Sequence, residues 1–154
     1  TMDEIDMKIL DILREDAKTP YYRIAEKVGI GTTTVHSRIQ KLIKEGIIER
    51  FTTLINYEKL GYDAFFVLGL SVEPDKIEDV AKKISEYDEV QMVGVTTGAH
   101  DIVVEVLGEN NKTIGKFINE KIKTIEGVRL NPGSIDISFF TEIYKHTHGI
   151  KLVK

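Results

Sequence analysis

The chain has 154 residues, of which 42% are hydrophobic and 30% are charged, and its formal net charge is -4. A chain of this length buries about 70% of the surface that its unfolded form exposes, which suffices for one sizeable core or two small ones. The absence of cysteine excludes disulfides, thiolate metal sites and cysteine nucleophiles. No apolar run approaches the ~18 residues of a membrane span, and the first residues lack a signal-peptide pattern. We therefore expect a cytoplasmic protein with no membrane partner.

Charge is distributed unevenly along the first 44 residues. Residues 3–16 carry six acidic and two basic side chains, a net charge of -4, whereas residues 18–44 carry six Lys or Arg and one Glu, a net charge of +5. A local basic patch can attract nucleic acid even when the whole chain is acidic. The alternative interpretation is two solvated surfaces of opposite sign.

The spacing of apolar residues predicts three amphipathic helices in the first part of the chain. The first covers residues 4–13, whose isoleucines and leucines form one stripe. A second helix is predicted to begin with Thr19 as its N-cap and Pro20 at its first helical position, and to end at Gly29. A third helix is predicted over residues 32–45. Three helices packed together predict one small apolar core.

The third predicted helix has two chemically different sides. Val35, Ile39 and Leu42 cluster on one side at 100° per residue. The opposite side carries hydroxyl groups near the N-terminus and cations toward the C-terminus. Short hydroxyl side chains let a helix approach base edges, while Lys and Arg reach phosphates. A solvated surface helix, which is the alternative, more often mixes Glu with Lys.

We therefore predict that this helix enters a groove of double-stranded DNA. The spacing of Ala25, Gly29 and Val35 supports this prediction, because helix-turn-helix units place a small residue, a turn glycine and a buried aliphatic residue at these relative positions. The predicted DNA-binding residues are Arg23, Lys27, Thr32, Thr33, Thr34, His36, Ser37, Arg38, Lys41 and Lys44. Arg38 is expected at the border of the outward side, where it would supply selectivity by base contact together with Thr33, Thr34 and Ser37. The other Lys and Arg residues are expected to contact phosphates.

The pattern changes after residue 50. Residues 51–61 are expected to form an extended linker strand, with a turn at the sequence KLGY. Residues 62–154 then show strand, helix, strand, strand, helix, strand, with strands expected at 63–72, 90–97, 102–108 and 134–144. The first of the two helices is expected to follow Pro74. The second is expected to carry an apolar stripe from Ile114 to Ile125 and to end at Gly127. This order predicts a ferredoxin-like βαββαβ domain, so the fold class is α+β.

The predicted strand 63–72 is apolar on both sides. Phe65 and Val67 point one way, and Phe66 and Leu68 point the other way. Right-handed crossovers place both helices on one side of the sheet, so the other side needs a cover. A sheet face exposed to water is one alternative. A second copy of the sheet is the other, and it predicts a homodimer.

The whole chain resembles the Lrp/AsnC family of leucine-responsive or feast/famine transcription regulators. The resemblance rests on D-x-x-D-x-x-I-L from Asp3, R-I-Q-K-L-x-x-x-G-I-I from Arg38, K-L-G-Y at 59–62, T-T-G-A-H-D at 96–101 and I-E-G-V at 125–128. It implies a winged helix-turn-helix domain over residues 1–50, followed by the regulatory (RAM-type) ferredoxin-like domain. It also implies dimers that assemble into tetramers or octamers.

In this family small effectors, commonly amino acids, bind between dimers near the loop that follows the second strand. A glycine there permits close backbone approach, and a carboxylate can hold an α-ammonium group. The effector-binding residues that the resemblance implies here are Thr96, Thr97, Gly98, Ala99, His100, Asp101 and Ser138. The alternative interpretation of His100 and Asp101 is a solvated histidine beside a loop aspartate that caps a strand.

Two other functions are weighed against the regulator hypothesis. An enzyme needs a nucleophile and base or a convergent acid-base set, and the sequence shows neither, so no catalytic residue or cofactor is predicted. His146 and His148 make a poor metal site without a third ligand, and we expect a surface pair instead. A module that uses its helix-turn-helix against another protein is the second rival; strongly salt-dependent binding to duplex DNA separates the two.

Overall fold

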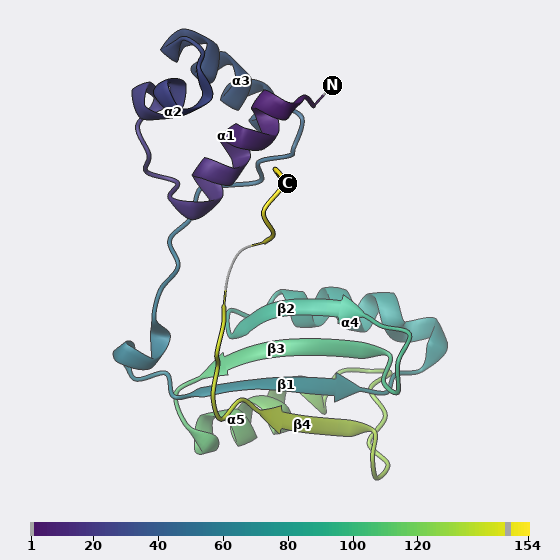
Figure 1. Cartoon of the computed structure of the whole chain (residues 1–154). Helices are drawn as coiled ribbons and strands as arrows, with labels where there is room; N and C mark the ends of the chain where they lie inside the picture. The colour runs from purple at the N-terminus through teal and green to yellow at the C-terminus, as the bar shows by residue number, and fades with distance from the viewer. Residues whose placement is uncertain (1, 147–148) are drawn as a thin grey trace. The chain divides into compact units, whose positions relative to one another are not determined.

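The computed structural model describes residues 2–146 and 149–154 and divides into two compact units (Figure 1). The first unit, called the head, contains Thr1–Leu54 and Lys145–Lys154. The second, called the body, contains Ile55–Tyr144. The chain therefore passes between the units twice, first after Leu54 and again after Tyr144.

The head contains the three predicted helices, α1 (Glu4–Glu15), α2 (Tyr21–Val28) and α3 (Thr32–Lys44). A capping box at Asp3 begins α1, because its side chain accepts from the backbone of Asp6 while the Asp6 side chain accepts from the backbone of Asp3. Gly29 ends α2 with a φ of 80°, the left-handed conformation expected of it.

The predicted cap of the second helix is wrong by one residue. Pro20, not Thr19, occupies the N-cap position, and no side chain caps α2. The Thr19 hydroxyl instead donates to the backbone oxygen of Asp16 at 2.7 Å, so it closes the preceding turn. A threonine hydroxyl has several backbone partners within reach, and the sequence alone does not select among them.

One apolar cluster holds the three helices of the head together. Ile9 of α1, Ile24 of α2, and Val35 and Ile39 of α3 are completely buried within it. Residues 45–56 form neither the linker strand nor the hairpin of a wing, and Tyr57–Leu60 is a short 3-10 helix, η1. A strand needs a hydrogen-bonded partner strand, and none is described beside this segment.

The body is a four-stranded antiparallel sheet with helices on one face (Figure 1). Its strands have the order β2-β3-β1-β4, which confirms the predicted ferredoxin-like topology. The strands are β1 (Ala64–Leu70), β2 (Val90–Val95), β3 (Ile102–Gly108) and β4 (Ile135–Phe139). The helices are η2 (Pro74–Lys76), α4 (Ile77–Ser85), α5 (Asn111–Phe117) and the π-helical η3 (Ile118–Ile122).

Several predicted boundaries in the body differ by one or two residues from those observed, and the two largest differences lie at the ends of the last helix and the last strand. The last helix changes from α to π geometry after Phe117 and ends at Ile122 rather than at Gly127. The last strand ends at Phe139 rather than at residue 144. Its partner β1 begins at Ala64, so the pairing stops shortly after the N–H of Phe140 donates to the backbone oxygen of Phe65.

Alternation along β1 assigns its side chains to the two faces of the sheet, as predicted. Phe66, Leu68 and Leu70 are completely buried beneath the helices. Phe65 and Val67 point to the opposite face, where they are only partly buried. We call this second side, which also carries Val103, Glu105 and Leu107 of β3, the open face.

Candidate nucleic-acid interface and effector loop

Helix α3 presents a polar outer side while its aliphatic side is buried. Val35 and Ile39 have no exposed surface and Leu42 is 1% exposed, so the rotation of the helix about its axis is fixed by the head's core. The exposed residues of α3 include eight that are polar or charged, as follows: Thr32, Thr33, Thr34, His36, Ser37, Gln40, Lys41 and Lys44. The arrangement predicted for a groove-binding helix is therefore present in the fold.

Helix α2 adds cations and aromatic rings beside α3. Arg23 and Lys27 are exposed, and the Arg23 guanidinium lies 5.7 Å from the ring centroid of Tyr22. The rings of Tyr21 and His36 lie 5.6 Å apart at a tilt of 57°, so α2 supports the imidazole of α3 from one side. Tyr22 is 53% exposed. Neither tyrosine was predicted to bind DNA, although their position before Arg23 at the start of a basic helix was a usable signal.

Arg38 has a different environment from its neighbours on α3. Its Nη1 atom donates to the carboxylate oxygens of Asp3 at 2.8 and 2.7 Å and to Oδ1 of Asp6 at 3.0 Å. The Arg38 side chain is 27% exposed and that of Asp6 only 4%. Hydrogen bonds from Arg38 lower the pKa of Asp3, and the two carboxylates raise the pKa of Arg38. In this structure Arg38 joins α3 to the capping box of α1.

The predicted effector loop folds back onto the end of β1. The hydroxyl of Thr96 donates to the backbone oxygen of His100 at 2.6 Å. The backbone N–H of Asp101 donates to Leu70, and Asp101 Oδ2 accepts from the N–H of Val72 at 2.8 Å. One oxygen of the Asp101 carboxylate therefore already caps β1. Thr97, Gly98 and Ala99 form the exposed tip of the loop.

His100 rests on the open face of the sheet at a glycine. A Cβ atom on Gly69 would lie 2.5 Å from Cδ2 of His100, so only glycine leaves room for the imidazole there. Nδ1 of His100 lies 3.3 Å from Oγ of Ser71. Ser138 is exposed on β4 opposite Val67, and no described hydrogen bond joins it to this loop. Neither Gly69 nor Ser71 was predicted, because their link to His100 depends on strand pairing.

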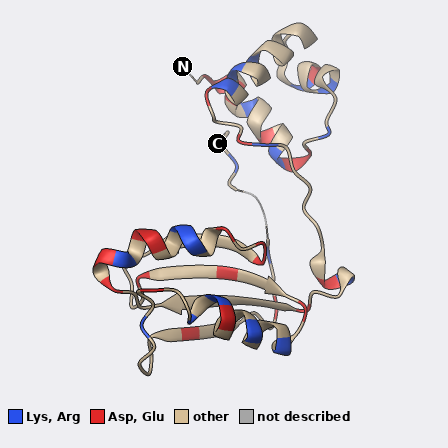
Figure 2. Cartoon of the chain, turned by 180° about the vertical axis from the view of Figure 1, so that it is seen from behind, with Lys and Arg blue, Asp and Glu red and all other residues tan. Residues whose placement is uncertain are grey.

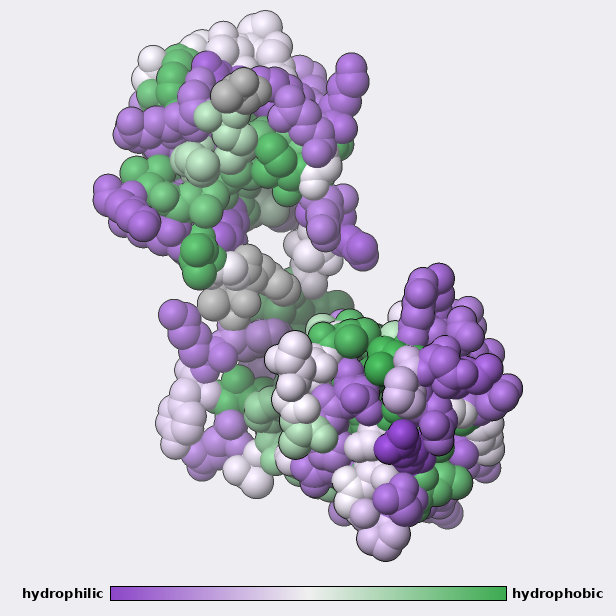
Figure 3. Space-filling view, turned by 90° about the vertical axis from the view of Figure 1, so that its right-hand side faces the viewer, coloured by the Kyte–Doolittle hydropathy of each residue, from purple (hydrophilic) through white to green (hydrophobic). Residues whose placement is uncertain are grey.

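The open face is largely apolar, with the Glu105 carboxylate near its centre and the exposed Asp136 on the edge strand β4. Phe65 stacks on Phe140 with ring centroids 4.8 Å apart. Glu105 on β3 lies opposite Val67 on β1 and Met92 on β2. Figure 2 shows the strands mostly in tan, with few Lys, Arg, Asp or Glu residues on the sheet. In the space-filling view, apolar side chains gather between hydrophilic ones on both units (Figure 3). An apolar face of this kind is suited to a protein partner.

Two classes of site are not found in the part of the chain that the structure describes. No group of three or more His, Asp or Glu side chains is placed to hold a metal ion there. His146 is exposed, while His148, the other member of the predicted surface pair, lies outside the described residues. No described helix has both the length and the apolar character that a bilayer span requires.

Both units match families of known regulators. The family model of the AsnC-type helix-turn-helix domain matches residues 2–43, and that of a C-terminal dimeric alpha+beta barrel domain of AsnC-type regulators matches residues 64–152. An HTH-type transcriptional regulator of Pyrococcus furiosus is 38% identical over 144 residues, which cover 94% of this chain and 95% of the relative. The chain belongs to the AsnC/Lrp family.

Other AsnC/Lrp proteins extend the comparison. The LrpA regulator of Pyrococcus horikoshii is 38% identical over 127 residues, or 82% of this chain and 90% of the relative. The structure of E. coli AsnC has a TM-score of 0.87 at 25% identity and covers 98% of this chain and 99% of its own. A Neisseria meningitidis regulator in complex with L-Met shares the fold, with a TM-score of 0.88 at 22% identity and coverage of 97% and 96%.

Membership of the AsnC/Lrp family decides the general function. The chain is a transcriptional regulator with a helix-turn-helix DNA-binding domain, and its relatives are regulators rather than enzymes. The head is the part matched to the DNA-binding domain.

Proposed function

We propose that the chain is a sequence-specific regulator that binds operator DNA as a homodimer and responds to a small effector such as an amino acid. The observation that carries this proposal is the orientation of α3: its aliphatic anchors are at most 1% exposed, while its hydroxyl and cationic side chains face outward. A helix fixed in this way can present one side to a major groove.

The side chains of α3 fall into two groups by the distance that they reach. Thr33, Thr34 and Ser37 are short, so they bring the helix backbone close to base edges and supply selectivity. Lys44 at the end of α3 and Lys27 on α2 carry long cationic side chains that reach phosphates and supply affinity. A dimer then places two α3 helices in successive major grooves, with half-sites about 10 bp apart or a multiple of that spacing.

The remaining residues have three proposed roles. Arg23 and Lys41 also contact phosphates, and Thr32 and His36 flank the base-reading residues. Arg38 holds α3 in place through its contact with α1. This assignment changes the predicted role of Arg38 from reading bases to positioning the helix that reads them. Three hydrogen bonds to Asp3 and Asp6 already engage Nη1 of its guanidinium group and direct it toward α1.

The open face of the body is the proposed dimer interface. Its partly buried Phe65 and Val67 would lose their remaining contact with water against a second copy. The matched family is described as a dimeric domain, which supports the same assembly. Tetramers or octamers would then form from these dimers.

The loop of residues 96–101 is the proposed effector site. The exposed Gly98 allows close approach of a ligand, and the second oxygen of Asp101 remains available beside the one that caps β1. The L-Met complex of the Neisseria regulator, which has this fold, supports an amino acid as the class of effector. A typical coupling between effector and DNA is ~1–3 kcal/mol.

Selection of bound duplexes from a random pool, repeated with each amino acid present, tests the proposal. The affinity for the selected duplex is then measured against salt. Each lost phosphate contact lowers the slope of log K against log salt by about 1, so Lys44→Gln should bind all duplexes more weakly with a smaller slope. Ser37→Ala should change the selected sequence instead. Lys112→Gln, at an exposed site on the body, is the matched control and should leave both unchanged.

Failure to enrich any sequence would contradict sequence-specific binding. Equal enrichment with and without every amino acid would contradict the effector part of the proposal while leaving DNA binding intact.

A further inference from the structure

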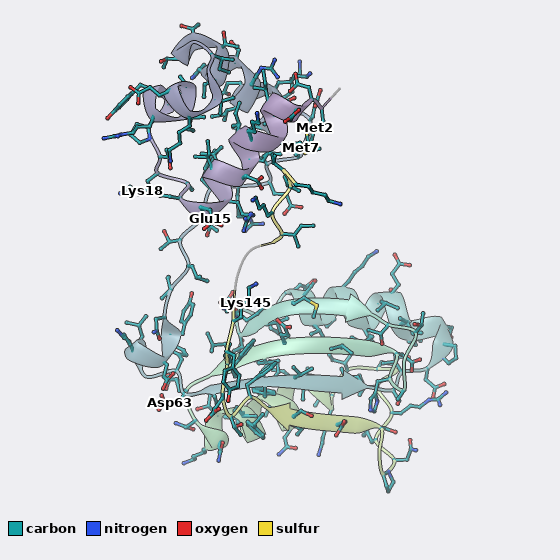
Figure 4. The ribbon with its side chains drawn as sticks, in the orientation of Figure 1. Met2, Met7, Glu15, Lys18, Asp63 and Lys145 are labelled. Atoms are coloured by element: carbon teal, nitrogen blue, oxygen red, sulfur yellow. The ribbon has the colours of Figure 1, made fainter. Side chains whose placement is uncertain are left out.

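Residues 149–154, here called the return segment, follow the body in the chain but pack with the head. The backbone N–H of Leu152 donates to Oδ1 of Asp11 at 2.7 Å, and that of Val153 donates to Oδ2 at 2.8 Å. Two consecutive amides thus bind both oxygens of one carboxylate on α1. In Figure 4 the return segment is the yellow ribbon beside α1.

The charges around Asp11 favour this contact. The Asp11 side chain is 16% exposed, and Nε of Arg14 lies 3.9 Å from its Oδ1. Hydrogen bonds from Leu152 and Val153 lower the pKa of Asp11, with smaller contributions from Arg14 and Lys151. Hydrogen bonds to a carboxylate are about twice as strong as those between neutral groups. The contact is therefore specific for an ionised Asp11.

The return segment lies outside the apolar core of the head. The core cluster is built from α1, α2 and α3 and includes no residue of the segment. Ile150 is 76% exposed and Leu152 is 36% exposed, while Val153 is partly buried but lies outside the core cluster. The attachment is thus mainly polar, and its release would not open the core. Such a contact is suited to reversible docking.

We propose that Asp11 is a docking site for the return segment of the same chain, and that the docked segment is a releasable strap between body and head. The chain already joins the two units once, after Leu54. A second connection reduces the range of positions that the head can adopt, so it raises the effective concentration of the second head once the first is bound to DNA. This effect on DNA binding rests on the proposed two-headed function.

Hydrogen exchange tests the docking itself. In the full chain the amides of Leu152 and Val153 should exchange slowly, and Asp11→Ala should abolish their protection. Glu15→Gln removes the same charge from an exposed site one helical turn away and should leave protection unchanged. Fast exchange in the unmodified protein, or protection that survives Asp11→Ala, would overturn the proposal.

Cross-linking identifies which copy supplies the segment. The chain contains no cysteine, so Glu15→Cys with Lys151→Cys provides a unique pair for a short bis-maleimide. We expect cross-linking within one chain, which leaves a monomer on a denaturing gel. A cross-linked dimer as the main product would place the segment on the partner's head and overturn docking on its own.

DNA binding tests whether the docked segment restricts the positions of the head or only stabilises the head itself. Asp11→Ala should weaken binding to a duplex with two half-sites by about 3- to 10-fold and leave binding to a single half-site unchanged. Equal losses of affinity for both duplexes would show that the substitution damages the head. No loss of affinity for either duplex would show that the strap does not restrict the head. Both results overturn the proposed role. If the unmodified protein binds both duplexes equally, the proposal of two-headed binding is contradicted. Hydrogen exchange still tests the docking of the return segment independently.

Discussion

Arg38 shows that a residue on a helix of a DNA-binding domain can join that helix to its neighbour. The sequence placed Arg38 at the border of the outward side of α3, where a DNA contact was the natural hypothesis. The structure pairs it with Asp3 and Asp6, which precede it by 35 and 32 residues. Spacing along one helix indicates which side a residue occupies, but the acid that it meets on another helix depends on how the two helices cross.

We predict that Arg38→Met reduces the free energy of unfolding by about 1–3 kcal/mol, because the buried Asp6 carboxylate would lose a charged partner. Arg23→Met, at an exposed site, should change it by less than about 0.5 kcal/mol. Chemical denaturation followed by circular dichroism measures both. Operator affinity of Arg38→Met should fall as well, since α3 loses its link to α1.

Rescue distinguishes positioning from base contact. Replacing Asp3 and Asp6 by Asn in the Arg38→Met background removes the unpaired charges and should restore part of the stability. If Arg38→Met lost operator affinity at unchanged stability, the earlier hypothesis of direct base contact would be favoured instead.

The pKa of Asp3 gives the same contact a pH dependence. Arg38 lowers this pKa in the folded state, so the unfolded state binds a proton first as the pH falls. The stabilisation should be fully present above about pH 4 and lost at lower pH as Asp3 becomes protonated. Denaturation curves from pH 3 to pH 7 should show a smaller pH dependence for Asp3→Asn. An unchanged curve would contradict this.

At the element scale, the turn between α2 and α3 sets the geometry of the DNA-binding unit. Gly29 has a φ of 80°, and an added Cβ would meet no atom within 4 Å. Any cost of substitution therefore comes from the backbone. We predict that Gly29→Ala lowers the free energy of unfolding by about 1–2 kcal/mol. Gly29→Asn should cost less, because asparagine adopts this conformation more readily. Equal stability of the Ala variant and the unmodified protein would contradict the prediction.

Helices were easier to predict than their ends. Periodic apolar residues such as Ile9, Ile24 and Ile39 decide which segments are helical, and all three are buried as that pattern requires. Ends depend on local competition for hydrogen bonds, as the hydroxyl of Thr19 shows by closing a turn instead of capping α2. The end of β4 depends on where β1 begins, which is a property of strand register rather than of either sequence segment.

At the scale of the whole molecule, contacts distant in sequence were beyond prediction. Asp11 and Leu152 are separated by 141 residues, and nothing in either local sequence indicates that one binds the other. The same holds for His100 on Gly69, which strand pairing brings together. By contrast, the need for a cover on the open face followed from alternation within one strand, so a single segment sufficed to predict it.

That face yields the remaining prediction. Val67 lies at the centre of β1, with Glu105 beside it on β3 and Ser138 beside it on β4. A lysine at this position would place an ammonium group between the two sheets, and even a pair with the neighbouring Glu105 would require both charges to be desolvated there. Val67→Lys should therefore shift the protein from dimer to monomer in sedimentation velocity, with the fold retained by circular dichroism.

Val95→Lys is the matched control for this change. Val95 is 62% exposed near the end of β2 and pairs with Ile102, so its side chain does not belong to the open face. This variant should remain at least dimeric. Because two α3 helices bind adjacent half-sites only when dimers form, Val67→Lys should also lower affinity for a two-half-site operator more than for a single half-site. A Val67→Lys protein that sediments as the unmodified one does would rule out the open face as the dimer interface.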